Sequence, residues 1–462
     1  MDEKNLTTAP ATLEEGEISA LLAARKFREL KEKLGHLAPQ DLATLLEELP
    51  TQEQLVVFRL LGKEAAAAAF VELPQECKQA IVEGYTDREL ADILNELYLD
   101  DTVDLIEEMP ANIVRRILRA SDPANRQDIN RLLHYPKDSA GTIMTTEYVR
   151  FRADMTVEEA LEHIRAVAID KETIYTCYVT TPDRQLIGIV TAKTLLISSL
   201  TAKLADIMER DVIAVHTDDD KEDVAKQLEK YDFLAIPVVD TENRLVGIVT
   251  VDDAIDVLSR ETEEDFAKMA AMTPNETPYL KTPVRRLYLA RVPWLMLLMI
   301  SATFSSMILG VFETALPAVL VLFVPMLMDS GGNSGSQASV TVIRGISLGE
   351  VTYRDLLRVL FKELRVGLCC GLTLGTVAFA KVLLVDHLLM HNPTVSVTVA
   401  LAVALSLCLT VLIAKMVGAL LPIIAKRIGL DPAVIASPFL TTIVDVLSLL
   451  LYFVIASRVF GL

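Results

Sequence analysis

The stretch VPWLMLLMISATFSSMILGVF, Val292–Phe312, is a run of 21 residues without a charged side chain. A helix rises about 1.5 Å per residue, so this run is long enough to cross the hydrocarbon core of a bilayer, which is about 30 Å thick. Arg291 and Trp294 stand at its start, where cationic and aromatic side chains anchor a helix at the membrane interface. The stretch therefore predicts a transmembrane helix and an integral membrane protein.

Four further segments complete a predicted bundle of five membrane helices in residues 284–462. They are Ala315–Met328 with its continuation to about Ile346, Val366–Val385, Thr394–Ala414 and Pro432–Ser457. The third of these has no charged residue, the second contains only Lys381, and the fourth contains only Asp445. The first is the weakest, because Gly, Ser and Asn interrupt its apolar pattern.

Loop charges predict the orientation of this bundle. Lys and Arg precede the first span and follow the second and fourth, whereas the other loops carry mainly acids and histidines. Because basic loops stay on the cytoplasmic side, we expect a multi-pass protein of the cell membrane with a cytoplasmic N-terminus and an extracytoplasmic C-terminus. The basic loop residues are Arg285, Arg286, Arg291, Arg344, Arg354, Arg358, Lys362, Arg365, Lys426 and Arg427.

The charge of the chain is strongly asymmetric. Residues 1–283 carry 55 acidic and 31 basic side chains, a net charge of −24, whereas residues 284–462 carry 8 acidic and 13 basic ones. Such an acidic soluble part repels nucleic acid, which is not expected as a partner, and attracts divalent cations. The sequence shows no nucleophile–base constellation, Walker motif or zinc motif, so an enzyme or an ATP-driven pump is not expected.

The soluble part is expected to begin with a flexible segment, residues 1–17, and an acidic helical domain, residues 18–135. Apolar residues recur there at three- and four-residue spacings, which is typical of amphipathic helices. Such segments are Asp41–Leu49, Glu89–Leu97 and Thr102–Met109, and proline breaks occur at Leu49-Pro50, Leu73-Pro74 and Met109-Pro110. We therefore expect a stack of short helices, arranged as an irregular helical repeat.

Residues 138–258 contain a clearer repeat. The motif Gly188-Ile189-Val190-Thr191 recurs as Gly247-Ile248-Val249-Thr250, and each copy follows a β-type run and a polar turn and precedes a helix start. An Ile-Met pair begins each copy, at 143–144 and at 207–208. Two such strand–helix–strand–strand–helix units, residues 138–200 and 201–258, resemble a pair of cystathionine-β-synthase (CBS) domains. Such pairs are regulatory and often bind adenine nucleotides.

A connecting segment, residues 256–283, follows the repeat and is expected to be helical at Asp256–Met272. Four acids lie within five residues near its start, at positions 261, 263, 264 and 265. Acids near a helix start interact favourably with the helix dipole, but four are more than this effect needs.

Asp445 is the sharpest chemical signal in the membrane half. It lies near the middle of its span, where an ionised carboxylate costs about 2.5–3.5 kcal/mol on insertion scales. The carboxylate must therefore face a polar cavity or a partner. A cation site is favoured, and the alternative is a structural hydrogen bond or an ion pair with Lys415 or Lys381.

Pro325–Gln337 is the second signal, because it combines three glycines with Asp329 and Asn333, which share one helix face. Such a stretch would fray a lipid-exposed helix, and non-helical backbone is tolerated at membrane depth only where it lines a cavity. The alternative is a small-residue packing motif. Hard oxygen ligands suit Mg²⁺, Ca²⁺ or Mn²⁺, and few carboxylates per site favour a Mg²⁺ ion that keeps its waters.

Several motifs occur together along nearly the full length of the chain. They are Tyr135-Pro136 with Ser139–Met144, Gly331-Gly332-Asn333, Asp431-Pro432-Ala433 and Ser437–Asp445. With this order of domains, the chain resembles the MgtE family of magnesium transporters. The expected fold is thus a multi-domain membrane protein with an all-α N-terminal domain, an α/β tandem CBS pair and an α-helical transmembrane domain of five helices.

The resemblance implies a homodimeric, channel-like Mg²⁺ transporter with its pore on the dimer axis. It places Asp445 as the pore carboxylate and Asp329, Gly332 and Thr441 at filter positions, beside Asn333. It also implies a sensor that closes the pore at high cytoplasmic Mg²⁺, when ions bridge acidic domains into a compact state, and opens it at low Mg²⁺. The implied sensor residues are Asp253, Asp256, Glu261, Glu264, Asp265, Glu222, Asp232, Asp100, Asp101 and Asp104.

Two other functions stay open on the residues alone. A CBS-regulated carrier could couple Asp445 to protons or sodium and move another divalent cation, such as Co²⁺ or Mn²⁺. A non-transporting membrane receptor could report Mg²⁺ or an adenine nucleotide bound at the CBS pair. Lys415 is charged where the family prefers a neutral residue, and we expect it to reach the interface or to pair with an acid.

Overall fold

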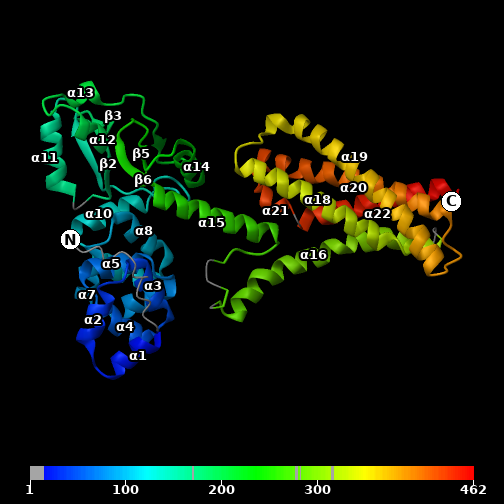
Figure 1. The fold of residues 1–462 in the computed structure, drawn as a ribbon, viewed down its shortest axis with the longest axis horizontal. Helices are drawn as coiled ribbons and strands as arrows, with labels where there is room; N and C mark the ends of the chain where they lie inside the picture. Colours follow the sequence, from blue (N-terminus) through cyan, green and yellow to red (C-terminus); the bar gives the residue numbers. More distant parts are fainter. Residues whose placement is uncertain are drawn as a thin grey trace, which may run out of the picture. The chain divides into compact units, whose positions relative to one another are not determined.

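The computed structural model describes residues 15–168, 171–275, 279–280, 282–313, 317–436 and 438–461. The chain divides into two compact units, Met1–Ser259 and Arg260–Leu462. The first unit contains short helices and two small sheets, and the second is helical (Figure 1).

Ten short helices open the described part of the first unit. They are α1 Glu15–Ala23, α2 Phe27–Leu34, α3 Pro39–Glu48, α4 Thr51–Leu60, α5 Lys63–Val71, α6 Gln75–Gly84, α7 Asp87–Leu94, α8 Leu99–Glu108, α9 Ala111–Ala120 and α10 Pro123–Leu132. Pro50, Pro74 and Pro110 are the N-caps of α4, α6 and α9, which confirms the predicted breaks. Proline fits a helix start because its fixed φ suits the first turn and its missing N–H is not needed there.

The start of this stack differs from the expectation of a flexible segment over residues 1–17. Helix α1 already begins at Glu15, and an acid in the first turn, such as Glu17, is favourable at a helix N-terminus. Residues 1–14 lie outside the described residues. The core between the helices is apolar and includes Phe58, whose ring lies 6.1 Å from that of Phe70 and 5.7 Å from that of Tyr85.

The predicted repeat forms two equivalent sheets. The first copy contains β1 Tyr148–Arg152, α11 Val157–Val167, β2 Thr173–Thr180, β3 Leu186–Thr191 and α12 Ala192–Ile197. The second contains α13 Leu204–Ile207, β4 Val215–His216, α14 Lys221–Tyr231, β5 Ala235–Val239, β6 Leu245–Thr250 and the start of α15 Val251–Met269. In each sheet the first two strands are parallel and the last two are antiparallel.

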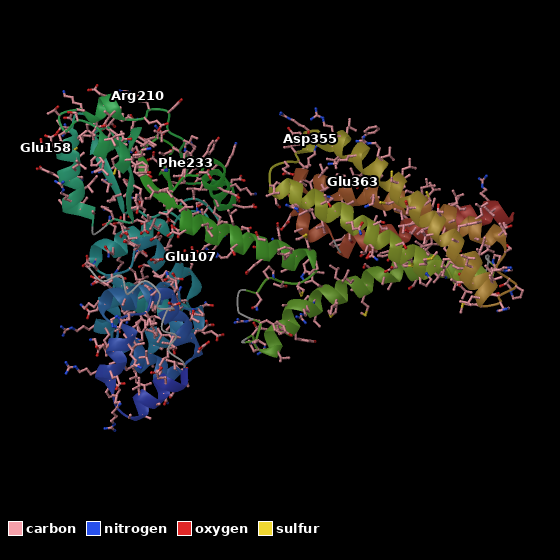
Figure 2. The ribbon with its side chains drawn as sticks, in the orientation of Figure 1. Glu107, Glu158, Arg210, Phe233, Asp355 and Glu363 are labelled. Carbon is pink, nitrogen blue, oxygen red and sulfur yellow. The ribbon has the colours of Figure 1, made fainter. Side chains whose placement is uncertain are left out.

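The repeated motifs hold the two copies together. A Cβ on Gly247 would lie 2.6 Å from the sulfur of Met144, and one on Gly188 would lie 2.8 Å from that of Met208. The methionine of each copy therefore packs on the glycine strand of the other copy, which explains why both residue types recur. Charged side chains such as Glu107, Glu158 and Arg210 project from the surface of this unit (Figure 2).

Helix α15 is longer than the connecting helix expected from the sequence. It begins at Val251, directly after β6, because no proline or glycine separates the last CBS helix from the acidic stretch. The first part of α15 belongs to the first unit, and the part from Arg260 onward belongs to the second.

The second unit contains a bundle of long helices. They are α16 Val284–Glu313, α18 Val324–Ser347, α19 Leu356–Lys381 with its π-helical continuation η3 Val382–Leu389, α20 Val397–Arg427 and α22 Pro438–Phe460, with the short helices α17 Ala318–Val321, η2 Tyr353–Asp355 and α21 Pro432–Ala436. Helix α20 packs against α18, α19 and α22, and α16 packs against α22. Asp355 and Glu363 mark the charged first part of η2 and α19 (Figure 2).

Four helices in the described residues are long and apolar enough to cross a membrane. They are Val284–Val311, Tyr353–Leu389, Val397–Arg427 and Phe439–Phe460. Helix α18, which covers most of the second predicted span, is not among them because of its polar residues and glycines. The segment predicted at Pro432–Ser457 is divided between α21 and α22.

The glycine-rich stretch is helical throughout, as part of the second predicted span. Small residues allow close packing there: a Cβ on Gly331 would lie 2.9 Å from both Ser448 Oγ and Thr410 Cγ2. A Cβ on Gly418 of α20 would lie only 2.2 Å from the backbone oxygen of Gly335. Glycine pairs thus bring the backbone of α18 close to α20 and α22, as the alternative interpretation proposed.

Candidate ion sites

The candidate pore residues lie on α18 and α22. A Cβ on Gly332 would have Thr441 Cγ2 as its nearest neighbour, at 3.7 Å, so the structure brings these two residues together. Asp329 and Asn333 are exposed on α18, and Asp445 is partly buried on α22, one helical turn beyond Thr441.

Asp445 forms no hydrogen bond or ion pair with any described residue. The ion pair with Lys381 is excluded, because Lys381 Nζ lies 2.8 Å from a carboxylate oxygen of Asp386. Lys415 is only 5% exposed and makes no ion pair or hydrogen bond with a described residue, so the expected pair with an acid is not found among the described residues. A Cβ added to Gly367 of α19 would lie 3.6 Å from the Cβ of Lys415, so Lys415 packs against this helix. The charge of Asp445 is therefore not neutralised by any residue that the structure describes.

A second group of acids lies where the later part of α15 meets the membrane helices. Lys268 Nζ lies 2.5 Å from Glu264 Oε1 and 2.6 Å from Asp431 Oδ2. Asp431 directly precedes α21. Ser347 Oγ, at the end of α18, lies 3.4 Å from Asp265 Oδ2. Burial lowers the pKa of Lys268, but its hydrogen bonds to Asp431 and Glu264 outweigh this and raise it. A lysine thus holds together two carboxylates that would otherwise repel.

A third group of acids lies in the first unit, where α8 faces the start of α15. Burial is the main cause that raises the pKa of Asp101 to about 7, and Asp253 and Asp104 add to it. Burial likewise raises the pKa of Asp253 to about 6, although a 2.6 Å hydrogen bond from Thr250 Oγ1 opposes the change. These residues, with Asp100, Asp252, Asp256, Glu147 and Glu172, are called the acid cluster below.

Two members of the acid cluster have buried oxygens without a hydrogen-bond donor among the described residues. They are Asp100 Oδ1 and Glu172 Oε2. Burial, Asp101, Asp253 and Glu172 raise the pKa of Asp100, and burial with Asp252 and Asp253 raises the pKa of Glu172 to about 8. Among the described residues no three acidic, histidine or cysteine side chains are arranged to enclose a metal ion directly.

Comparisons with known proteins match the whole sequence of domains. Family models match as the MgtE intracellular N domain at residues 37–138, as CBS domains at 140–200 and 204–260, and as MgtE, a divalent cation transporter, at 324–455. The magnesium transporter MgtE of Thermus thermophilus is 39% identical over 462 residues, which cover 99% of this chain and 98% of that protein. The chain belongs to the MgtE family. The MgtE of Bacillus subtilis is 35% identical over 95% of this chain and 96% of its own.

Solved structures of MgtE relatives agree with the fold of the first unit. The cytosolic domain of a Mg²⁺ channel MgtE in complex with ATP is 39% identical, with a TM-score of 0.51, and covers 53% of this chain and all of that one. The soluble part of a magnesium transporter is 31% identical, with a TM-score of 0.50, and covers 53% of this chain and 97% of that one. The MgtE family consists of transporters rather than enzymes, as the sequence predicted.

Some sensor residues implied by the MgtE resemblance are not brought together. Glu222 and Asp232 lie at opposite ends of α14, about 15 Å apart along the helix axis. Glu222 pairs with Lys226 at 2.7 Å, and Asp232 is the left-handed C-cap of α14. Glu261 lies on α15 in the second unit, with Glu264 and Asp265.

Sequence reasoning missed other members of these groups. Asp252 and Glu172 belong to the acid cluster, and Lys268 of α15 forms an ion pair with Asp431, just before α21. Asp252 adjoins the predicted sensor residue Asp253, and Lys268 lies four residues after Glu264, so their positions in the sequence could have indicated both. Glu172 gave no such signal, because it comes near α8 only through the tertiary fold.

Proposed function

We propose that this chain is a Mg²⁺ transporter of the cell membrane, with a channel-like pore and Asp445 as its pore carboxylate. The observation that carries the proposal is the carboxylate of Asp445, which pairs with no described residue. It lies on an apolar helix, near the contact of Gly332 with Thr441. An ionised carboxylate at membrane depth needs a compensating cation. The magnesium transporters that are 35–39% identical over nearly the full length support Mg²⁺ as that cation.

The proposed transporter is a homodimer whose pore lies between the two copies. The exposure of Asp329 and Asn333 on one face of α18 supports this arrangement, because polar groups at membrane depth need water or a second chain around them. Two Asp445 carboxylates, with Asp329, Gly332, Asn333 and Thr441 as filter, would offer oxygen groups to one hydrated Mg²⁺. The basic loops support a cytoplasmic N-terminus, and the four long apolar helices together with α18 support five membrane helices.

Gating by cytoplasmic Mg²⁺ is also proposed. The acid cluster joins α8 to α15, and Glu264 and Asp265 join the later part of α15 to α21 and α18. Cations that bind only when these carboxylates are close favour the closed state at high Mg²⁺. At low Mg²⁺ the carboxylates repel, and the pore opens. An adenine nucleotide at the CBS pair is supported by the related cytosolic domain solved with ATP.

The decisive experiment is a Mg²⁺ uptake assay in proteoliposomes with Asp445→Asn and Asp445→Ala. Because the pore carboxylate compensates the charge of the ion, both variants should lose at least about tenfold in flux, while the melting temperature stays within a few degrees of wild type. Glu350→Gln, an exposed acid between α18 and η2, is the matched control. Flux like wild type in both Asp445 variants would exclude the pore assignment.

The same assay separates the other functions. A carrier for Co²⁺ or Mn²⁺ would respond to an imposed proton or sodium gradient and would prefer those ions when Mg²⁺, Mn²⁺, Co²⁺ and Ca²⁺ are compared. A receptor would show no flux with any of them. A channel follows the Mg²⁺ gradient and the membrane potential alone.

A further inference from the structure

The first part of α19 carries a row of basic side chains that belongs neither to the candidate ion sites nor to the proposed pore. Arg358, Lys362 and Arg365 are spaced by four and three residues, so they share one helix face. Arg354 stands four residues before Arg358, on η2. All four residues are exposed, and they are called the basic stripe below.

An apolar stripe runs directly beside the basic stripe. Its members are spaced by four, three and four residues, and three of them immediately precede a residue of the basic stripe. They are Leu357, Phe361, Leu364 and Leu368, which are 79%, 60%, 39% and 57% exposed. The opposite face of the helix is the packed one, because Leu356 and Leu360 contact the apolar core between α18 and α20. Both stripes therefore lie on the outer side of α19.

In a bilayer the basic stripe lies at the depth of the lipid headgroups. The apolar span Tyr353–Leu389 has 37 residues and is about 55 Å long as a helix, whereas the hydrocarbon core is about 30 Å thick. No charged residue occurs between Arg365 and Lys381, so this part of the helix fits the core. The turns before Arg365 therefore extend beyond the core, into the headgroup layer.

Little acidic charge compensates the basic stripe. Among the described residues only Arg358 of the four forms an ion pair, with Asp355 Oδ1 at 3.2 Å, and its side chain is still 88% exposed. Asp355 Oδ2 also accepts hydrogen bonds from the backbone N–H and the hydroxyl of Thr352. The guanidinium carbon of Arg365 lies 4.8 Å from the centroid of the Phe361 ring, so this contact joins the basic stripe to the apolar one.

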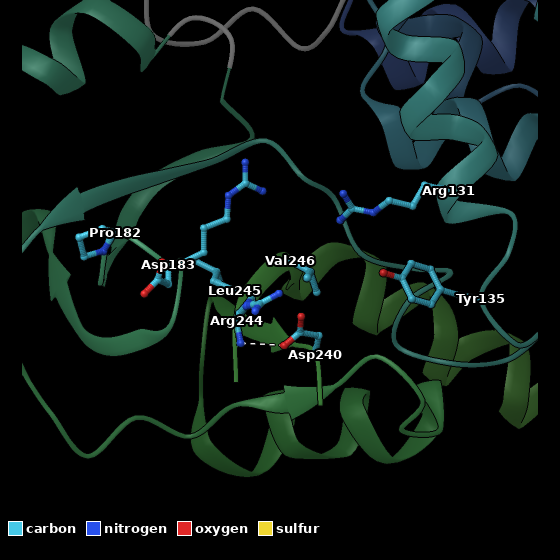
Figure 3. Close-up of a pocket in the computed structure, with 9 residues that line it drawn as sticks. Arg131, Tyr135, Pro182, Asp183, Asp240, Arg244, Leu245 and Val246 are labelled. Atoms are coloured by element: carbon cyan, nitrogen blue, oxygen red, sulfur yellow. Dashed lines mark hydrogen bonds between the residues drawn. The ribbon is translucent and has the colours of Figure 1, made fainter. Parts of the chain in front are cut away.

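The first unit also gathers arginines, but acids stand among them. A cavity of about 540 Å³ there is lined by the arginines Arg131, Arg184 and Arg244 and by the acids Asp183 and Asp240 (Figure 3). The basic stripe forms an ion pair with one carboxylate among the described residues, that of Asp355. An anion from outside the chain is therefore better placed to compensate the stripe on α19.

The packing of α19 leaves this face open to lipid. Among the long helices, α19 packs mainly against α20, whereas the candidate pore residues lie on α18 and α22. A second copy that completes the proposed pore would face α18 and α22. The outer side of α19 is then left to the bilayer around the protein.

We propose that the basic and apolar stripes together bind an anionic phospholipid. Its phosphate lies on Arg358, Lys362 and Arg365, and one acyl chain follows the apolar stripe toward Leu368. Charge-assisted hydrogen bonds from guanidinium and ammonium groups hold the phosphate, and the net positive charge of the stripe selects a headgroup with a net negative charge. The proposal goes beyond the transport function, because it concerns the lipid around the protein and not the ion that passes through it.

The test is lipid titration of the full-length protein in detergent, with bound lipid counted by native mass spectrometry. The probes are dioleoylphosphatidylglycerol, dioleoylphosphatidylcholine, which has the same chains without a net charge, and glycerol 3-phosphate, which has a phosphate without a chain. The wild type should bind phosphatidylglycerol at least about tenfold more tightly than the other two. The double variant Arg358→Gln with Lys362→Gln should lose at least about tenfold in affinity for phosphatidylglycerol, because each cation near a headgroup contributes about a factor of five.

Two controls separate a specific site from diffuse attraction. Arg285→Gln with Arg291→Gln removes the same charge from α16, which packs against α22, and should bind phosphatidylglycerol like wild type. Lys362→Arg keeps the charge of the stripe and should also bind like wild type. An equal loss of affinity in the α16 control would overturn the proposal, because the lipid would then respond to net charge alone.

The probes also identify the occupant. Equal affinity of the wild type for both lipids would overturn the proposal and leave this face to a second copy or to any lipid. Glycerol 3-phosphate bound as tightly as phosphatidylglycerol would overturn it in favour of a free phosphate. If the double variant does not fold, Lys362→Gln alone should lose at least about threefold in affinity. The assay measures no transport, so its outcome is independent of the pore assignment.

Discussion

Gly331 and Gly332 are neighbours on α18, but an added methyl group would meet different surroundings at the two positions. At Gly331 it would lie 2.9 Å from Ser448 Oγ and Thr410 Cγ2, and 3.1 Å from Val444 Cγ1. At Gly332 its nearest contact would be Thr441 Cγ2 at 3.7 Å, an ordinary van der Waals distance. We therefore expect Gly331→Ala to destabilise the bundle by about 1–3 kcal/mol through overpacking, and Gly332→Ala to leave the fold intact.

Size-exclusion chromatography of heated detergent samples measures this difference as a melting temperature. Gly310→Ala on α16, with no atom within 4 Å of the added group in the chain, is the control for a helical glycine. If Gly332 belongs to the filter, Gly332→Ala should also reduce Mg²⁺ flux without a lower melting temperature. Equal melting temperatures for Gly331→Ala and wild type would contradict the packing assignment.

Single residues also show where prediction from the sequence stops. The depth of Asp445 follows from counting uncharged neighbours, and this is independent of tertiary structure. The sequence does not show that Lys381 is engaged elsewhere and does not pair with Asp445. Lys381 and Asp386 are five residues apart and would not face each other on a regular α-helix. Their 2.8 Å contact occurs at the π-helical segment η3, which the apolar pattern gave no reason to expect.

At the scale of elements, α15 is one continuous helix whose later part is tied to the membrane helices by a lysine. Lys268 lies between Glu264 and Asp431 and is itself mostly buried. Lys268→Gln would leave these two carboxylates facing each other without a positive charge, at a cost of about 1 kcal/mol to the contact. If that contact belongs to the closed state, the Mg²⁺ concentration for half-closure should rise about fivefold.

Flux measured against internal Mg²⁺ in liposomes checks this shift. Arg260→Gln, an exposed cation on the same helix, is the matched control and should leave half-closure unchanged. A half-closure concentration that does not move in Lys268→Gln would mean that this contact does not take part in gating. The periodicity of the sequence predicts the helix that carries Lys268. It does not predict the ion pair with Asp431, because the two residues are 163 positions apart and only the fold brings them together.

At the scale of the whole molecule, composition and contacts divide the chain at different places. The charge pattern places the boundary near residue 283, where the basic and apolar residues begin, whereas the contacts place it between Ser259 and Arg260. The difference arises because the later part of α15 is polar in sequence but packs, through Asp265 and Lys268, with the second unit. Hydropathy reports the solvent that a segment prefers, and it does not report which neighbours the segment contacts.

We expect the acid cluster to make the stability of the first unit depend on pH and on divalent cations together. The folded pKa values of Asp253, Asp101 and Glu172 are raised to about 6, 7 and 8, above the ordinary values of 3.8 to 4.5. Between about pH 4 and pH 8 the folded state therefore binds more protons than the unfolded state, so its stability falls as the pH rises. In a chelator, the melting temperature should drop by several degrees from pH 5.5 to pH 8.

Mg²⁺ should restore the lost stability, and should do so more at pH 8 than at pH 5.5, because protons and cations compete for the same carboxylates. The double variant Asp101→Asn with Asp253→Asn removes two of the repelling charges, so its melting temperature should vary less with pH and respond less to Mg²⁺. Asp128→Asn, an exposed acid on α10, should keep the wild-type profile. A Mg²⁺ effect that is equal at both pH values, or unchanged in the double variant, would place the sensing carboxylates outside the acid cluster.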